Sequence, residues 1–185
     1  PVTEHLSPVL KMPGVHNLEN VLTAIAITTI AGISKDIIVQ AVNNFSGLEH
    51  RLEFVREING IKFVNDSKAT NPDSVLVALK SFSEKLILIM GGLDKGLPYT
   101  ALTPLVKEKV RILLLIGEAE KIIADQMKGA TEIISCGTLD KAVEKAYRLA
   151  DKDEIVLLSP ACASFDQFED FEERGRIFKE LVGKL

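Results

Sequence analysis

The sequence has no tryptophan and only two cysteines and three histidines among its 185 residues. Cys136 and Cys162 are too few for a disulfide framework, so we expect packed thiols in a reducing, cytoplasmic setting. His5, His16 and His50 show neither zinc-site spacing nor the surroundings of a Ser-His-Asp triad. These shortages argue against a zinc protein and against a serine hydrolase.

Long apolar runs are also missing. The longest, VLTAIAITTIAGI at residues 21–33, is too short to cross a bilayer and contains threonines, so it predicts a buried helix. The first residues, PVTEHLSPVLKM, lack the basic and apolar regions of a signal peptide. The net charge of -4 argues against nucleic acid as the main partner, because phosphate binding favours a basic face. Neither GxxxxGK[ST] nor GxGxxG occurs, so no phosphate loop or dinucleotide fingerprint is present.

The apolar fraction of 46% is enough for a folded core. Two helices are predicted first, at 16–30 and 34–45, followed by a polar linker at 46–51. Beyond it, strands alternate with helices, which is typical of an open, doubly wound α/β sheet of the Rossmann-like kind. We predict strands at 52–58, 61–66, 85–90, 110–117, 131–136 and 154–159, and helices at 72–82, 101–109, 118–127, 139–150 and 168–185. Asn59-Gly60 predicts a hairpin that adds one antiparallel edge strand.

Three of the loops that follow strands are rich in polar groups. They read NDSKATN at 65–71, GGLDKG at 91–96 and SPACASFDQF at 159–168. Ligands of such sheets bind beyond the carboxyl ends of the strands, so these loops should meet at one edge. Lysines, hydroxyls and helix N-termini there suit a small anionic ligand.

Each loop alone also has a simpler interpretation. Asn71 or Asp73 could cap one helix, Ser164 or Asp166 could cap the last, and the glycine pair at 91–92 could form only a turn.

Four motifs together resemble a known family. HNLEN at 16–20, EHRLE at 49–53, NDSKATN and SPACASFDQF occur in the order and spacing of the Mur ligases. The last two most resemble the branch that adds D-glutamate. The resemblance implies that residues 48–185 form the C-terminal, Rossmann-like domain that binds the amino acid. It also implies that residues 1–47 are the last two helices of the central ATPase domain.

The resemblance implies an ATP-dependent ligase of peptidoglycan synthesis. It would join D-glutamate to UDP-N-acetylmuramoyl-L-alanine through an acyl phosphate, with ATP and Mg²⁺ as cofactors. The metal ligands and the phosphate loop would lie outside this chain, so we expect no metal site here and no turnover by the chain alone. We also expect a monomer.

The resemblance assigns roles residue by residue. The amide side chains of Asn17 and Asn20 would lie near the adenine. The guanidinium of Arg51 would bind nucleotide oxygens, and Asp66 would accept from the ribose hydroxyls. His50 would align the nucleotide, and Lys68 would lie near the reacting phosphate. Groups holding the carboxylates of D-glutamate would be Thr70, Lys95, Ser164 and, through its backbone, Phe171.

Alternatives stay open at this point. Asn17 could cap the first helix, and Arg51 could be a surface charge. The chain could also belong to a Mur-type ligase for another amino acid, or be a stand-alone module that binds a small anion. A purely structural role would leave the polar loops unexplained.

Overall fold

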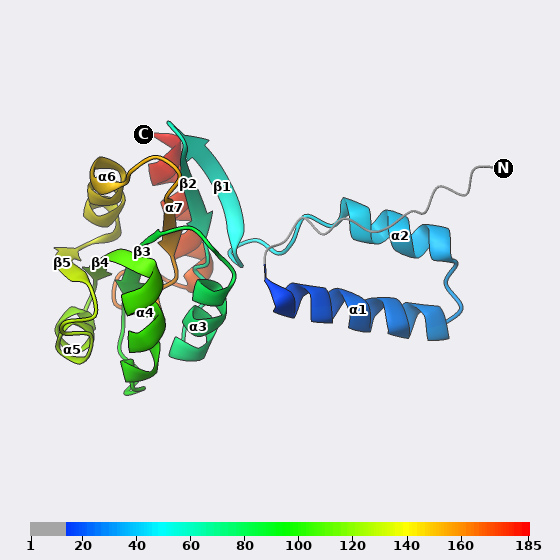
Figure 1. Ribbon diagram of the computed structural model, residues 1–185, viewed down its shortest axis with the longest axis horizontal. Coiled ribbons are helices and arrows are strands. Elements are labelled where there is room, and N and C mark those ends of the chain that lie inside the picture. Colours follow the sequence, from blue (N-terminus) through cyan, green and yellow to red (C-terminus); the bar gives the residue numbers. More distant parts are fainter. Residues whose placement is uncertain (1–13) are drawn as a thin grey trace. The chain divides into compact units, whose positions relative to one another are not determined.

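The computed structural model describes residues 14–185, which divide into two compact units, one ending at Leu48 and one spanning Glu49–Leu185. The first contains two helices, α1 (Val15–Ile30) and α2 (Lys35–Asn44), drawn in blue to cyan (Figure 1). Both lie where helices are predicted. None of the helices in the described part of the chain is long and apolar enough to span a bilayer.

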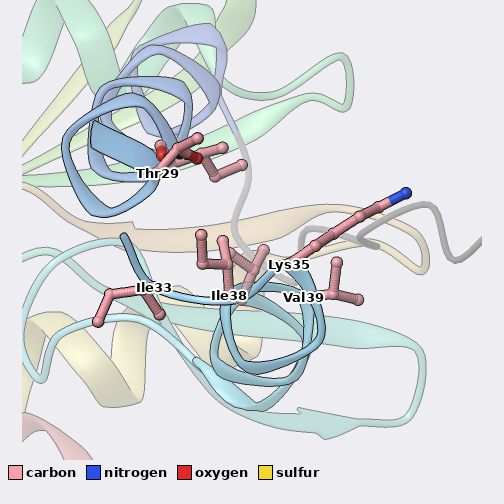
Figure 2. A pocket seen from close by; sticks show the side chains of 7 residues that line it. Thr29, Ile33, Lys35, Ile38 and Val39 are labelled. Atoms are coloured by element: carbon pink, nitrogen blue, oxygen red, sulfur yellow. Dashed lines mark hydrogen bonds between the residues drawn. The ribbon is translucent and has the colours of Figure 1, made fainter. Parts of the chain in front are cut away.

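The prediction that α1 is buried is wrong. Its side chains Ile27 and Ile30 are 62% and 88% exposed, and Ile37 of α2 is 58% exposed. A cavity of about 390 Å³ lies between the two helices and is lined by residues of both, among them Thr29 of α1 and Ile38 and Val39 of α2 (Figure 2). Two helices alone do not enclose a core. The apolar composition of α1 therefore does not show whether another part of the protein covers this helix.

The second unit is built on a six-stranded sheet of order β1-β2-β6-β3-β4-β5. The strands are β1 (Glu53–Ile58), β2 (Ile61–Asn65), β3 (Leu86–Gly91), β4 (Val110–Ile116), β5 (Glu132–Gly137) and β6 (Ile155–Leu158). Only β1 runs antiparallel, which confirms the predicted edge strand. Asn59 and Gly60 both have positive φ, as a tight two-residue hairpin requires.

Helices cover both faces of this sheet (Figure 1). One face packs against α3 (Pro72–Lys80), the short η1 (Thr100–Leu102), α4 (Thr103–Lys109) and α5 (Glu120–Gln126). The other packs against α6 (Leu139–Leu149) and α7 (Phe171–Gly183). In β3, Leu86, Leu88 and Met90 point to the first face and Ile87 and Ile89 to the second, so the strand is apolar throughout.

The last helix begins three residues later than predicted. Asp170 caps α7, because its Oδ1 accepts a hydrogen bond of 2.6 Å from the backbone N–H of Glu173. Neither Ser164 nor Asp166 is therefore the cap of this helix. Asn71 does cap α3, by accepting from the N–H of Ser74 at 2.9 Å.

Strand β6 lies between β2 and β3, yet it leads to a helix on the opposite face from theirs. Adjacent strands whose connections leave to opposite faces open a crevice at their carboxyl ends. The loops after β2, β3 and β6 border this crevice.

Candidate functional site

Backbone hydrogen bonds join the three polar loops, as predicted. The N–H of Ala161, after β6, donates to the carbonyl of Ala69, after β2, at 2.9 Å. The N–H of Leu93, after β3, donates to the carbonyl of Ala163 at 2.9 Å, in an isolated antiparallel bridge. These loops, far apart in sequence, therefore form one continuous surface.

The glycine pair after β3 allows the close approach. Gly92 has a φ of 131°, and a Cβ there would clash with the carbonyl oxygen of Ala163. A Cβ on Gly91 would likewise clash with the carbonyl of Ile116. A side chain at either position would push neighbouring backbone apart.

Asp66 lies beneath this surface, 5% exposed. Its Oδ2 accepts from the hydroxyl of Ser159 at 2.8 Å, and its Oδ1 from the N–H of Leu52 at 3.2 Å. Burial raises the pKa of Asp66 to about 7, against the opposing effect of these hydrogen bonds and of the Arg51 charge. Each carboxylate oxygen keeps a second acceptor position, so Asp66 can accept from a further hydroxyl.

His50 is buried behind the loop after β2. Its Nδ1 lies 2.9 Å from Nδ2 of the fully buried Asn65, and its carbonyl accepts from the N–H of Lys68 at 3.0 Å. Asn65 also holds the loop directly, because its Oδ1 accepts from the N–H of Ser67 at 3.1 Å. His50 has a φ of 64°, a left-handed backbone conformation that is unfavourable for a non-glycine residue and that the surrounding contacts must stabilise.

Arg174 of α7 is fully buried and was not predicted as part of the site. Its Nε donates to the hydroxyl of Ser67 at 3.0 Å, and its two terminal nitrogens donate to the carbonyls of Ser67, Cys162 and Ala163. Within residues 14–185, no carboxylate forms an ion pair with it. Burial lowers the pKa of Arg174 to about 10, so it stays charged at neutral pH. The guanidinium thus joins the loops after β2 and β6 and leaves a positive charge beneath them.

The predicted ligand-binding residues of this unit surround the same edge. Lys68 and Lys95 are exposed, Thr70 is half-buried, and Ser164 is 2% exposed. The Nζ of Lys68 lies 4.7 Å from the ring centroid of Phe171, the first residue of α7. The N–H of Phe171 belongs to the first turn, where N–H groups have no acceptor within the helix.

Charges of both signs act on that helix end. The helix dipole and the nearby Lys68 favour an anion, whereas Glu172 and Glu173 in the first turn offset part of the attraction. Arg51, in the segment before β1, is exposed.

Asn17 and Asn20 lie in the first unit, three residues apart on α1, and so share one face of that helix. Asn17 is buried and Asn20 is exposed.

Among residues 14–185, one side-chain cluster has ligand atoms close enough for a metal ion. The side chains of Glu49, His50 and Glu53 offer one such atom each, all within 4.8 Å of one another. Lys179 already forms ion pairs with both glutamates, with its Nζ 2.5 Å from Glu49 and 3.0 Å from Glu53. His50 is held by Asn65. The cluster is therefore satisfied internally and does not suit Mg²⁺, which prefers oxygen ligands and water.

Comparison with known proteins agrees with this description. Residues 50–162 match the family described as Mur ligase, glutamate ligase domain. The chain is 48% identical over 184 residues to the UDP-N-acetylmuramoylalanine--D-glutamate ligase of Elusimicrobium minutum, covering 98% of this chain and 40% of that protein. It is 50% identical over 172 residues to the protein of the same name from Solibacter usitatus, covering 93% and 39%. The chain thus spans about two fifths of the length of these relatives, in their C-terminal part.

Solved structures share the fold at lower identity. The UDP-N-acetylmuramate-alanine ligase of Thermotoga maritima superposes with a TM-score of 0.70 at 20% identity, covering 95% of this chain and 39% of that one. Folylpolyglutamate synthase from the same organism gives 0.66 at 19%, covering 96% and 41%. These likenesses confirm the Rossmann-like fold class. With its glutamate ligase domain and its near relatives, the chain belongs to the Mur ligase family.

Proposed function

We propose that this chain holds D-glutamate in an ATP-dependent ligase that joins it to UDP-N-acetylmuramoyl-L-alanine during peptidoglycan synthesis. The observation that carries the proposal is the junction of the loops after β2, β3 and β6, which gathers cationic and hydroxyl groups at one edge. Near relatives that are named as ligases for this amino acid support it.

D-Glutamate carries two carboxylates, and the edge offers donors for both. We assign one carboxylate to Lys95 and Thr70, whose ammonium and hydroxyl groups extend from the loops after β3 and β2. We assign the other to the Ser164 hydroxyl and the N–H of Phe171 at the start of α7. Such groups would hold the amine in position for attack, which is the main contribution expected of a binding domain.

The nucleotide would meet the same edge from its other side. In this proposal Arg51 binds phosphate or ribose oxygens, Asp66 accepts from a ribose hydroxyl, and Lys68 lies near the reacting phosphate. His50 aligns this region indirectly, because its carbonyl fixes the backbone of Lys68. Asn17 and Asn20 would contribute to the adenine site from α1.

ATP and Mg²⁺ belong to the proposal for the intact ligase. We propose that residues 1–47 are the end of its central ATPase domain, and the exposed isoleucines of α1 and α2 support this because they need a cover. Phosphate-loop residues and metal ligands would come from that domain, so this chain alone should release no ADP with both substrates present. A monomeric state and a cytoplasmic setting stay predictions.

A backbone NMR titration of the chain with D-glutamate tests the proposal, with L-glutamate and D-alanyl-D-alanine as comparison ligands. We expect shifts at Thr70, Lys95, Ser164 and Phe171 with D-glutamate alone. Lys95→Met should weaken these shifts, whereas Lys128→Met, an exposed lysine after α5, should not. An equal response to all three ligands, or none, would contradict the assignment of D-glutamate to this pocket.

A further inference from the structure

A buried tyrosine joins two of the site loops through its hydroxyl group. Tyr99, between β3 and η1, is 1% exposed and its ring belongs to the core under α3, α4 and α5. Its hydroxyl lies 2.8 Å from Oδ1 of Asp94 and 3.1 Å from Sγ of Cys162. Asp94 is in the loop after β3, and the fully buried Cys162 is in the loop after β6.

The hydrogen bonds of this group have a definite direction. Burial raises the pKa of the Cys162 thiol to about 11 and raises the pKa of Tyr99 as well, so both groups are protonated at neutral pH. Tyr99 has one proton, which it donates to the carboxylate of Asp94. The thiol of Cys162 is therefore the donor to the Tyr99 oxygen, and the chain of donors runs Cys162 to Tyr99 to Asp94.

Asp94, the final acceptor in this series of hydrogen bonds, also shapes the turn that carries Lys95. The same Oδ1 of Asp94 accepts from the N–H of Gly96 at 3.2 Å, which closes the turn around Lys95. At the other end, Cys162 precedes Ser164 by two residues, and Leu93 is bridged to Ala163 between them. The Tyr99 hydroxyl thus connects the Lys95 turn to the backbone that presents Ser164.

We propose that Tyr99 is a positioning residue that fixes the separation between Lys95 and Ser164, and thereby the length of the amino dicarboxylate that the site accepts. This inference rests on the proposed function, in which those two residues hold opposite carboxylates. A phenylalanine would fill the same core volume. It would lack the hydroxyl, which adds a side-chain link between Asp94 and Cys162 to the backbone bridge between Leu93 and Ala163.

The first test needs no ligand and uses the whole chain. Tyr99→Phe should shift the backbone amides of residues 93–96 and 163–164 and lower the ¹⁵N heteronuclear NOE of Gly96. Tyr147→Phe is the matched control, since its hydroxyl accepts a hydrogen bond from the exposed Asn59 at the hairpin, and it should leave these signals unchanged. If Tyr99→Phe also leaves them unchanged, the positioning role is wrong.

The second test measures length selectivity. D-Aspartate, D-glutamate and D-2-aminoadipate are titrated into the wild-type chain, Tyr99→Phe and Tyr147→Phe. We expect Tyr99→Phe to reduce the preference for D-glutamate over the other two by about five-fold, the effect of one hydrogen bond, and Tyr147→Phe to preserve it. A uniform loss of affinity for all three would indicate mere stabilisation and overturn the selectivity role.

The two proposals fail in different ways. A wild-type chain that binds none of the three compounds would contradict the proposed function, while the ligand-free comparison still decides whether Tyr99 couples the loops.

Asp94→Ala provides a second variant at the half-buried end of the network, should Tyr99→Phe unfold the chain. It should disturb Gly96 and the amides around Ala163 in the same way, and intact signals around Ala163 would count against the coupling.

Discussion

The carboxyl group of Asp66 lies in a buried environment that opposes its ionisation, and this has a consequence for stability. Its pKa is about 7 in the folded chain, against an ordinary value near 3.8. Between these values the folded state holds a proton that the unfolded state has lost, so stability falls as pH rises from about 4 to 7. The loss from this one group is up to about 4 kcal/mol and is complete above pH 7.

Asp66→Asn removes the titration while keeping the size of the side chain. Urea unfolding of both proteins at pH values from 4.5 to 8 should therefore show the wild type losing stability relative to the variant as pH rises. A stability difference that does not change with pH would show that Asp66 ionises in the folded chain as it does in water.

Arg174 is expected to be the most costly single side chain to remove from the site. Arg174→Met would leave the hydroxyl of Ser67 and the carbonyls of Cys162 and Ala163 without this donor in the interior. Unsatisfied buried groups of this kind destabilise by about 3–5 kcal/mol. Arg176→Met is the matched control on the same helix, because Arg176 is exposed, and it should change the free energy of unfolding by less than about 0.5 kcal/mol. Equal effects of the two changes in urea unfolding would contradict the loop-joining role.

At the scale of elements, α7 packs closely enough at Gly175 to reverse the usual effect of glycine in a helix. Alanine normally stabilises a helix interior by about 1 kcal/mol relative to glycine. At Gly175, however, a Cβ would clash with the imidazole of His50, which is held in place by Asn65. We expect Gly175→Ala to destabilise the chain and to shift the NMR signals of the loop after β2.

Gly183 in the last turn of the same helix is the control. Nothing lies within 4 Å of a Cβ placed there, so Gly183→Ala should be neutral or stabilising in thermal unfolding. If both alanines stabilise, the contact between α7 and His50 is looser than described.

The central strands β3, β4 and β6 were predictable because each is buried on both faces and therefore reads as a nearly unbroken apolar run. The edge strands β1 and β5 are only partly buried. The Asn59-Gly60 turn was predictable for a local reason, since its residues tolerate positive φ. The meeting of the polar loops followed from the parallel arrangement of the strands, because the carboxyl ends of parallel strands lie at the same edge of the sheet.

Other features depend on three-dimensional context that residue order does not contain. Arg174 stands in a highly charged stretch, FEERGR, which resembles the solvent face of a helix although the Arg174 side chain is buried. The sequence around Tyr99 does not distinguish it from an ordinary core tyrosine. The assignment of ligand roles to residues at the edge came from family resemblance, and it stays a proposal until a ligand is bound.

At the scale of the whole molecule, the two units differ in how much of their own core they contain. Both large hydrophobic clusters consist of residues from Leu52 onward. In α1 and α2, by contrast, Val39 is the buried apolar side chain among those described, at 9% exposure. The sheet unit is therefore expected to fold by itself, whereas the helical pair is not.

This difference predicts the result of dividing the chain. Residues 49–185 alone should keep the amide NMR spectrum of the sheet and lose less than about 1 kcal/mol of stability, because no cluster residue is removed. Residues 1–48 alone should show little helix by circular dichroism, since helices of 16 and 10 residues without an enclosed core are marginal in water. Loss of cooperative unfolding in the 49–185 chain would mean that the helical pair supports the sheet. If the 49–185 chain stays folded, D-glutamate binding can be measured without α1 and α2. This measurement would test the amino-acid pocket separately from the nucleotide-binding residues assigned to α1.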